Sequence, residues 1–256
     1  MRKISILAIA AGFACIFLAM TSFAADDVAL KVTARNGKVL VKAYPSTKWT
    51  ELTVGQMVHA KDVIKTDVCD VHVKDKKYVD AKGQACPLCG AATLELPDKS
   101  SVSLKPGSEM SVDELVLDNA SRKLKVSMPK GELRMIITKV STPSDFSVKT
   151  PNAIYGATGT VFYVNVTPTG TSIYVADGSV NVVNPVTGAV YSVPAGMVMT
   201  FNPDGTVVGP TAASDLDVTN WTACYTPTTE PYTPPIMNNG NVTPPNNTPE
   251  RPVSGG

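Results

Sequence analysis

Short runs of β-branched and aromatic residues, alternating in polarity and separated by turn residues, fill the chain from Phe146 to Gly196. The run 161–166 is followed by a turn at 168–170, and the run 171–176 is followed by Asp177-Gly178. Alternation with a period of two is typical of a strand with one buried face, and a two-residue Asp-Gly link is typical of a hairpin. This stretch therefore predicts paired antiparallel strands, with Asp177-Gly178 as a hairpin turn.

The same pattern extends in both directions along the chain, and no long amphipathic helix interrupts it. Many short strands at such spacing predict an all-β sandwich, a roll or a short β-solenoid with one continuous core. One or two helical turns are expected within 212–221. Further strands are expected at 28–41, 54–73, 93–96, 101–104, 115–117, 123–128, 132–140, 189–193 and 197–201. The predicted core includes Val148, Phe162, Val164, Ile173, Val175, Val180 and Val182.

The first residues have the pattern of an export signal. Arg2 and Lys3 precede an apolar run from Ile4 to Met20, and Ser22-Phe23-Ala24 supplies small residues where a signal peptidase cleaves. We therefore expect 1–24 to be a signal peptide and the rest to be exported to the periplasm, the cell surface or the medium. No second apolar run is long enough to cross a bilayer, so no transmembrane span is expected in the mature chain.

The last residues differ sharply in composition from the rest. From Thr226 to Gly256 the chain is rich in Pro, Asn, Thr and Gly and has almost no apolar residue, so it cannot bury enough surface to offset the cost of ordering. We expect three regions: the signal peptide 1–24, a β domain 25–210 with a cysteine-containing insertion at about 67–92, and a C-terminal extension 211–256 that ends in a disordered tail.

The charge does not favour a nucleic acid as partner. Removal of Arg2 and Lys3 changes the formal net charge from +1 to −1. Binding to phosphates needs clustered lysine and arginine, and the nearest approach to a basic run, 74–77, is interrupted by Asp75. We therefore expect neither a nucleic acid nor an anionic membrane as partner.

The region around residues 146–196 resembles the FecR-like domain, which is named for the ferric citrate regulator of bacterial envelopes. The family pattern has Phe-x-Val-x-Thr-Pro-x-Ala, then Gly-Thr-x-Phe-x-Val, then Gly-x-Val and Ala-Gly. The matching residues here are Phe146, Val148, Thr150, Pro151, Ala153, Gly159, Thr160, Phe162, Val164, Gly178, Val180, Ala195 and Gly196. The usual arginine before Gly-Thr is Thr158 in this chain.

A looser match extends the resemblance over most of 34–201, with the insertion as an interruption. Trp49 lies in the family-like run Trp-x-x-Leu-x-x-Gly, so we expect it in the core, whereas Tyr155, Tyr163 and Tyr174 could pack in the core or form a recognition surface. Lys61 and Lys99 stand where relatives often carry glycine. The resemblance implies an all-β fold and a role in envelope sensing or signal relay. Full regulators add a sigma-factor-binding segment and a membrane helix, which we do not expect in this chain.

Four cysteines follow the signal: Cys69, Cys86, Cys89 and Cys224. An even number in an exported chain favours disulfides, without selecting among the three possible pairings. The alternative is a zinc site formed by Cys69, His72, Cys86 and Cys89, because tetrahedral zinc accepts thiolates and imidazole. Free or redox-active thiols are a third possibility. Disulfides, and no cofactor, are the favoured prediction.

The sequence gives little support to catalysis. It has two histidines, His59 and His72, and neither lies in a known nucleophile or phosphate-binding motif. The neighbouring carboxylates Asp113 and Glu114, like Asp26 and Asp27, would point to opposite faces of a strand and would not act as an acid and base pair. A zinc hydrolase would need an open site with three protein ligands and a base, and the sequence does not allow such a site to be assembled. We therefore expect no enzyme activity.

The sequence thus predicts a non-enzymatic, exported FecR-like binding module of the bacterial cell envelope. Its expected partner is an envelope protein or glycan, contacted through strand edges and loops. The alternative is a structural surface component that disulfides stabilise and that the proline-rich tail holds away from the envelope.

Overall fold

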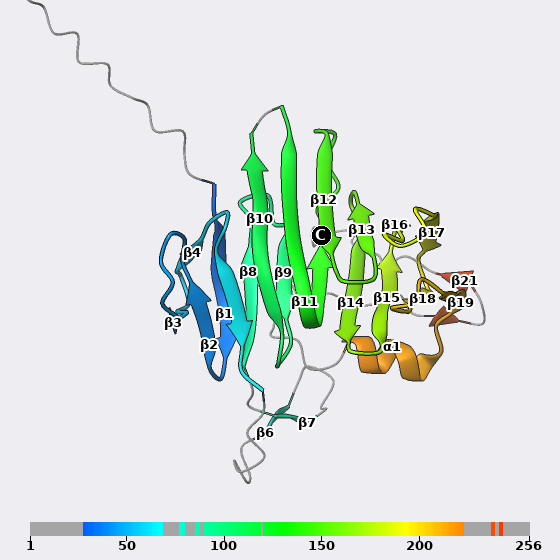
Figure 1. Cartoon of the computed structure of the whole chain (residues 1–256), viewed down its shortest axis with the longest axis horizontal. Coiled ribbons are helices and arrows are strands. Elements are labelled where there is room, and N and C mark those ends of the chain that lie inside the picture. Colours follow the sequence, from blue (N-terminus) through cyan, green and yellow to red (C-terminus); the bar gives the residue numbers. More distant parts are fainter. Residues whose placement is uncertain are drawn as a thin grey trace, which may run out of the picture.

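The computed structural model describes residues 28–68, 77–79, 85–87, 90–118, 120–222, 237–238 and 241–242. Nearly all regular structure is β, and one short helix, α1 (Asp215–Thr222), follows the last long strand (Figure 1). The strands are β1 (Leu30–Asn36), β2 (Val39–Lys42), β3 (Thr50–Glu51), β4 (Met57–Val58), β5 (Val63–Thr66), β6 (Lys77–Val79), β7 (Ala85–Pro87), β8 (Ala91–Glu95), β9 (Ser101–Leu104), β10 (Glu109–Leu117), β11 (Arg122–Ile136), β12 (Ser144–Lys149), β13 (Ile154–Ala157), β14 (Val161–Thr167), β15 (Gly170–Asp177), β16 (Ser179–Val183), β17 (Val190–Pro194), β18 (Met197–Phe201), β19 (Val207–Ala212), β20 (Met237–Asn238) and β21 (Asn241–Val242).

Strand pairing divides the body into two sheets. Sheet A has the order β4-β1-β8-β9-β11-β14-β15-β18-β19. Sheet B has the order β3-β2-β5-β10-β11-β12-β13-β16-β17. Most neighbours are antiparallel, and β11 with β12 is a parallel pair. The expected all-β fold of many short strands, given as a sandwich, a roll or a short β-solenoid, is confirmed.

The long strand β11 belongs to both sheets and joins them. Its first part pairs with β10 and β12 in sheet B, and Gly131–Ile136 pairs with β9 and β14 in sheet A. The sequence had predicted two separate strands here. They are one bent strand, because Gly131 adopts a φ of 99° and lets the backbone approach Ser108, where a Cβ on Gly131 would lie 2.3 Å from the Ser108 Cα.

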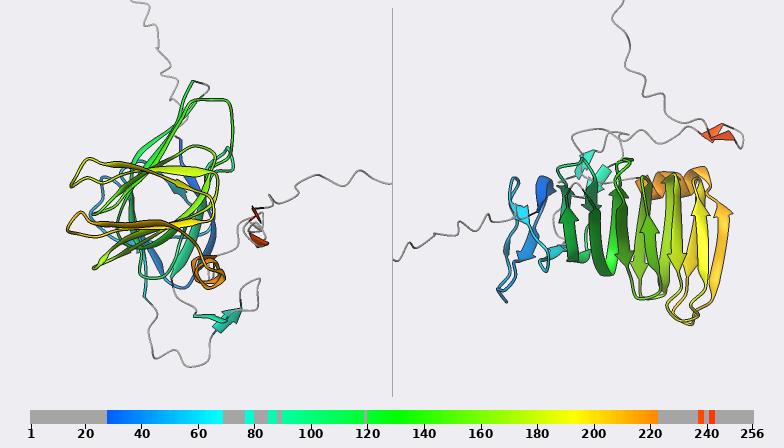
Figure 2. Two further views of the ribbon diagram at one scale, coloured as in Figure 1. Left: turned by 90° about the vertical axis from the view of Figure 1, so that its right-hand side faces the viewer. Right: turned by 90° about the horizontal axis from the view of Figure 1, so that it is seen from above.

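The chain advances from one end of the body to the other while it alternates between the sheets (Figures 1 and 2). The predicted turn at Pro168–Gly170 is confirmed, because β14 and β15 pair around it. The prediction of a hairpin at Asp177-Gly178 is wrong. β15 pairs with β14 and β18 in sheet A, whereas β16 pairs with β13 and β17 in sheet B. Gly178, with a φ of 81°, is a corner between the sheets and not a turn within one.

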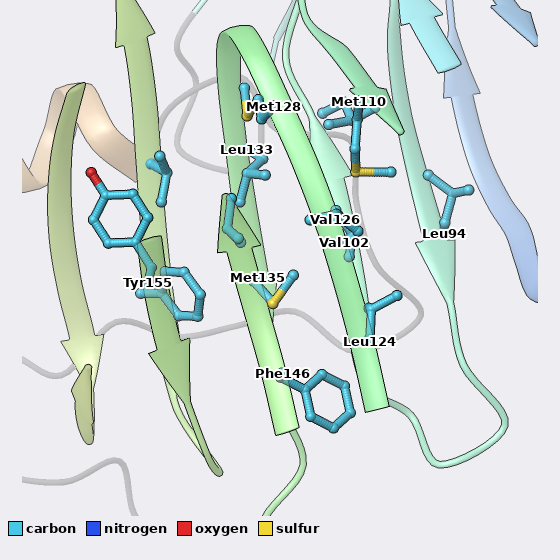
Figure 3. Close-up of a cluster of buried hydrophobic side chains, with 14 of the residues drawn as sticks. Leu94, Val102, Met110, Leu124, Val126, Met128, Leu133, Met135, Phe146 and Tyr155 are labelled. Atoms are coloured by element: carbon cyan, nitrogen blue, oxygen red, sulfur yellow. The ribbon is translucent and has the colours of Figure 1, made fainter. Parts of the chain in front are cut away.

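The core lies between the two sheets. Leu94 and Val102 from sheet A lie in one hydrophobic cluster with Met110 and Val126 from sheet B (Figure 3). All seven of the predicted core residues are fully buried, which confirms that prediction. The placement of Trp49 in the core is wrong: its side chain is 39% exposed, while Leu52, three residues later, is buried.

The predicted helical turns near the end of the β domain are confirmed as α1. Ser214 precedes the helix; its hydroxyl accepts a hydrogen bond from the Asp217 N–H, and the Asp217 carboxylate accepts one from the Ser214 N–H. This reciprocal arrangement satisfies N–H groups at the start of the helix. Within the part of the chain that the structure describes, no helix is long and apolar enough to span a membrane.

Candidate recognition surface

The family-motif glycines lie at corners where the chain passes between the sheets. Gly159, Gly178 and Gly196 have φ angles of 64°, 81° and 79°, in the left-handed region that glycine adopts without steric cost. A Cβ on Gly178 would lie 2.7 Å from the Thr160 Cγ2 atom, and the Gly178 carbonyl accepts a hydrogen bond from Ala195 N–H at 2.9 Å. The structure therefore brings these motif residues together as one set of corners.

The other motif residues form a turn and part of the core. The Thr150 hydroxyl donates to the Ala153 carbonyl at 2.8 Å and accepts from the Ala153 N–H at 3.1 Å, which closes the turn that contains the exposed Pro151. The remaining five, Phe146, Val148, Phe162, Val164 and Val180, are buried. In this arrangement most of the motif residues support the fold.

A buried ion pair, which the sequence did not reveal, ties several strands together. The Arg122 guanidinium, 4% exposed, pairs with the Asp98 carboxylate. The same guanidinium donates to the Thr138 carbonyl and to the Ser144 hydroxyl, both at 3.1 Å, and lies 5.0 Å from the Phe146 ring centre. Because every one of these contacts is internal, we assign the pair a structural role.

A second buried cluster lies on the outer face of sheet A. The rings of Tyr163 and Tyr174 stack with their centres 5.7 Å apart, and Trp221 of α1 packs over both at 6.5 and 6.4 Å. Burial raises the pKa of Tyr163 to about 12, although Arg134 opposes the shift. Burial also raises the pKa of Tyr155, which lies in the main core. These three tyrosines pack inside the protein, so they do not form a recognition surface.

The predicted cysteine chemistry lies outside the described residues. Cys69, His72, Cys89 and Cys224 are outside them, and Cys86 is placed only as a backbone position in β7, opposite Tyr78. The disulfide and zinc hypotheses both remain predictions. Among the residues that are described, no group of three or more histidine, cysteine or acidic side chains could hold a metal ion.

The described carboxylates that were considered for catalysis have other contacts. Asp113 accepts hydrogen bonds from Ser111 and Ser127, and Glu114 pairs with Lys125 at 2.9 Å, which lowers the pKa of Glu114. The two residues are not arranged as an acid and base pair. Asp26 and Asp27 lie outside the described residues.

Two exposed aromatic rings, each paired with a lysine, lie at the N-terminal end of the body. The Lys42 Nζ atom is 5.2 Å from the centre of the Trp49 ring, and the Lys61 Nζ atom is 4.7 Å from the centre of the Tyr44 ring. Tyr44 is 62% exposed. We call these four residues the lysine–aromatic surface. A lysine ammonium group is attracted to the face of an aromatic ring. The exposed part of each ring still offers a large apolar area for contact with a partner.

Buried Asp62 holds the Tyr44 and Lys61 part of this surface in place. Its Oδ1 atom accepts a hydrogen bond from the Tyr44 N–H at 2.8 Å, and its Oδ2 atom accepts one from the His59 N–H at 2.9 Å. The carboxylate thus connects the loop that carries Tyr44 to the turn that carries Lys61. The His59 Nδ1 atom lies 4.0 Å from the same carboxylate, and its side chain is partly exposed, which agrees with the structural or surface role expected for it.

The turn that carries Lys61 has an unusual backbone. Lys61 has a φ of 75°, and Lys99 is the other non-glycine residue with a positive φ in the described part of the chain. A left-handed conformation is unfavourable for residues with a Cβ. At Lys61 the conformation places the ammonium over the Tyr44 ring. The sequence signalled both lysines as replacements of glycine, but it did not indicate that Tyr44 and Trp49 would be exposed and would each lie against a lysine.

Comparison with known proteins gives one family match. A family model described as FecR protein matches residues 89–181. Two crystal structures of a "putative anti-sigma factor" from Parabacteroides distasonis ATCC 8503 align with this chain at 21% and 22% identity, each with a TM-score of 0.43. Both alignments cover 51% of this chain and 59% of that chain, so this chain spans less than two thirds of their length. No curated protein matches the chain.

The family match and the structure agree on the same stretch of the fold. Residues 89–181 include β8 to β15, the bent strand β11, and the corners at Gly159 and Gly178. The first motif residue, Phe146, and the hydrophobic residues Val148 and Phe162 lie in the core of this stretch. The match to the FecR family model thus covers a continuous part of the two-sheet body.

Proposed function

We propose that this protein is a non-enzymatic, exported binding module of the bacterial cell envelope with a sensing or regulatory role. The FecR domain supports a regulatory role. The observation that carries the proposal of binding is the lysine–aromatic surface, where each of two exposed rings lies against an ammonium group and a buried carboxylate holds the loop that carries Tyr44. Exposed aromatic and cationic groups are common in recognition sites, because they give large contact area and directional attraction.

The proposed partner is an envelope protein or an envelope glycan. Both can place apolar faces against aromatic rings and anionic or hydroxyl groups against lysine. The strand edges at the same end are less suitable for contact than the sequence suggested. β3 and β4 have two residues each, which is too short to act as a template for an added strand. The side chains of the lysine–aromatic surface are therefore the proposed contact.

The proposal is tested by binding of the purified chain to peptidoglycan sacculi and to solubilised envelope proteins. Wild type is compared with Tyr44→Ala/Trp49→Ala, which removes both rings. Val140→Ala, an exposed residue in the loop after β11, is the matched control. We expect wild type and the control to bind and the double variant to lose at least about tenfold in affinity, which corresponds to about 1.4 kcal/mol. Equal binding by all three would show that another surface is responsible.

A further inference from the structure

The two-sheet body has open ends, because neither sheet closes on itself. At the N-terminal end the last strands are β3 and β4, and at the C-terminal end they are β17 and β19 (Figure 1). At the C-terminal end, β17 contains Pro194 and β19 contains Pro210. Proline lacks an N–H donor, and it is one of the devices that block addition of a further strand. Contact at the ends must therefore use side chains.

Exposed apolar side chains gather at these two ends. Of the large hydrophobic residues that are exposed in the described part of the chain, seven lie on or beside the four terminal strands, and two, Val68 and Val140, lie elsewhere. Repeating β structures normally cover their ends with polar residues, so apolar ends indicate contact with another surface. The N-terminal set is Tyr44, Trp49, Val54 and Met57, and the C-terminal set is Val186, Val190 and Val208.

The two ends have opposite charge. Residues 28–68 contain seven lysine or arginine residues and three acidic residues. Residues 150–222 contain no lysine or arginine and four acidic residues, Asp177, Asp204, Asp215 and Asp217, of which Asp177 pairs with Lys139 at 3.7 Å. Hydrogen bonds to Thr206 and Ser214 lower the pKa of Asp204 and of Asp217 respectively, so both carboxylates stay ionised near neutral pH. The chain is thus net basic in the strands of the N-terminal end and net acidic in residues 150–222, which include the strands of the C-terminal end.

We infer that the N-terminal end of one copy of this chain docks on the C-terminal end of a second copy. The apolar sets on the two ends make the contact, and the opposite charges orient it. Such a contact joins different surfaces of the two partners, so it does not close after two copies and can continue into a head-to-tail row. The inference rests on the proposed function, because it assigns a partner to the lysine–aromatic surface.

The test uses the chain exported to and purified from a bacterial periplasm, with two variants that each block one end. The head variant, Tyr44→Ser/Trp49→Ser, removes the rings at the N-terminal end. The tail variant, Val190→Lys/Val208→Lys, adds positive charge to the C-terminal end. The control is Val68→Lys/Val140→Lys, which adds the same charge away from both ends. Thermal unfolding of each variant verifies that it is folded.

Sedimentation measures the mass of each sample over a range of concentrations. We expect the weight-average mass of wild type and of the control to rise with concentration beyond about twice the monomer mass, and raising salt from about 0.05 M to about 0.5 M should weaken the association. Each blocked variant alone should stay monomeric. An equimolar mixture of the two should form a 1:1 dimer and stop there, because each supplies the end that the other lacks.

Two results would overturn the inference: a monomeric wild type at all concentrations, or blocked variants whose mixture stays monomeric although both are folded. Lys42→Glu/Lys61→Glu provides a second head variant that leaves the rings in place. Failure of this inference is distinct from failure of the proposed function. The tail variant keeps the lysine–aromatic surface, so its binding to sacculi or envelope proteins tests that function in a monomer.

Discussion

At the residue scale, a small number of backbone conformations explain why certain residue types occur where they do. Gly159, Gly178 and Gly196 take left-handed φ angles at the corners, and Lys61 and Lys99 take the same conformation although they have a Cβ. Such a residue is strained by roughly 1 kcal/mol or more relative to glycine. At Lys61 the strain coincides with an exposed aromatic contact, which is consistent with a functional position.

Replacement of Lys99 by glycine should relieve strain. We expect Lys99→Gly to raise the free energy of unfolding by up to about 1 kcal/mol, because the gain in backbone conformation exceeds the loss of the exposed ion pair with Glu95. Urea denaturation measures the change. The matched control is Lys149→Gly in β12, which should lower the free energy of unfolding by about 0.5–1 kcal/mol. Equal destabilisation by both changes would contradict the left-handed conformation at Lys99.

The buried tyrosines make the protein sensitive to high pH. Burial raises the pKa of Tyr163 to about 12, whereas tyrosine in an unfolded chain has a pKa near about 10. The folded state therefore keeps a proton that the unfolded state loses, and stability that is complete below about pH 10 falls as the pH approaches about 12. Tyr163→Phe should make this fall less steep in urea titrations at successive pH values. An unchanged slope would show that Tyr163 ionises normally.

At the scale of single elements, β11 determines how the two sheets are joined. It passes from sheet B to sheet A at Gly131, where the backbone lies against Ser108. The sequence predicted the strands on either side but not their continuity. Proline at 129 and glycine at 131 are typical of a break between two strands. The same residue types also occur at a bend within one strand, so the sequence does not distinguish the two cases.

Addition of a Cβ at this bend should be costly. We expect Gly131→Ala to lower the free energy of unfolding by more than about 2 kcal/mol, because the new atom would overlap Ser108 and force the backbones apart. Gly55→Ala is the control, since Gly55 has a similar φ of 88° and no atom within 4 Å of the added Cβ. The control should cost about 1 kcal/mol. If both substitutions cost the same in chemical denaturation, the close approach at Gly131 is not present.

The Arg122–Asp98 pair connects the turn between β8 and β9 to the start of β11. Asp98→Asn should lower the free energy of unfolding by about 3–5 kcal/mol, because it leaves a buried guanidinium without its counter-charge. Arg122→Met/Asp98→Asn should cost less than the sum of the two single changes. Lys123→Ala, which removes an exposed partner of Glu114, should change stability by less than about 0.5 kcal/mol. Additive effects in urea denaturation would contradict a coupled pair.

At the scale of the whole molecule, alternation of apolar residues was enough to predict an all-β body and the residues of its core. It could not assign strands to sheets. An Asp-Gly pair such as 177–178 suits both a hairpin and a corner between sheets, so it does not indicate whether the next strand stays in the same sheet. It also could not predict the exposure of Trp49, since a tryptophan before a strand fits a core and a surface equally well. The pairing of Lys42 with Trp49 depends on the tertiary path of the chain.

The family-motif residues belong to the scaffold, and we propose that recognition takes place at the N-terminal end. The most direct test compares how Thr150→Ala and Tyr44→Ala/Trp49→Ala bind to solubilised envelope proteins and sacculi. Thr150→Ala removes hydrogen bonds of the motif turn, so it should lower thermal stability and leave the affinity of the folded protein unchanged. The double variant should keep its stability and lose binding. Loss of binding in Thr150→Ala with full binding by the double variant would contradict the account.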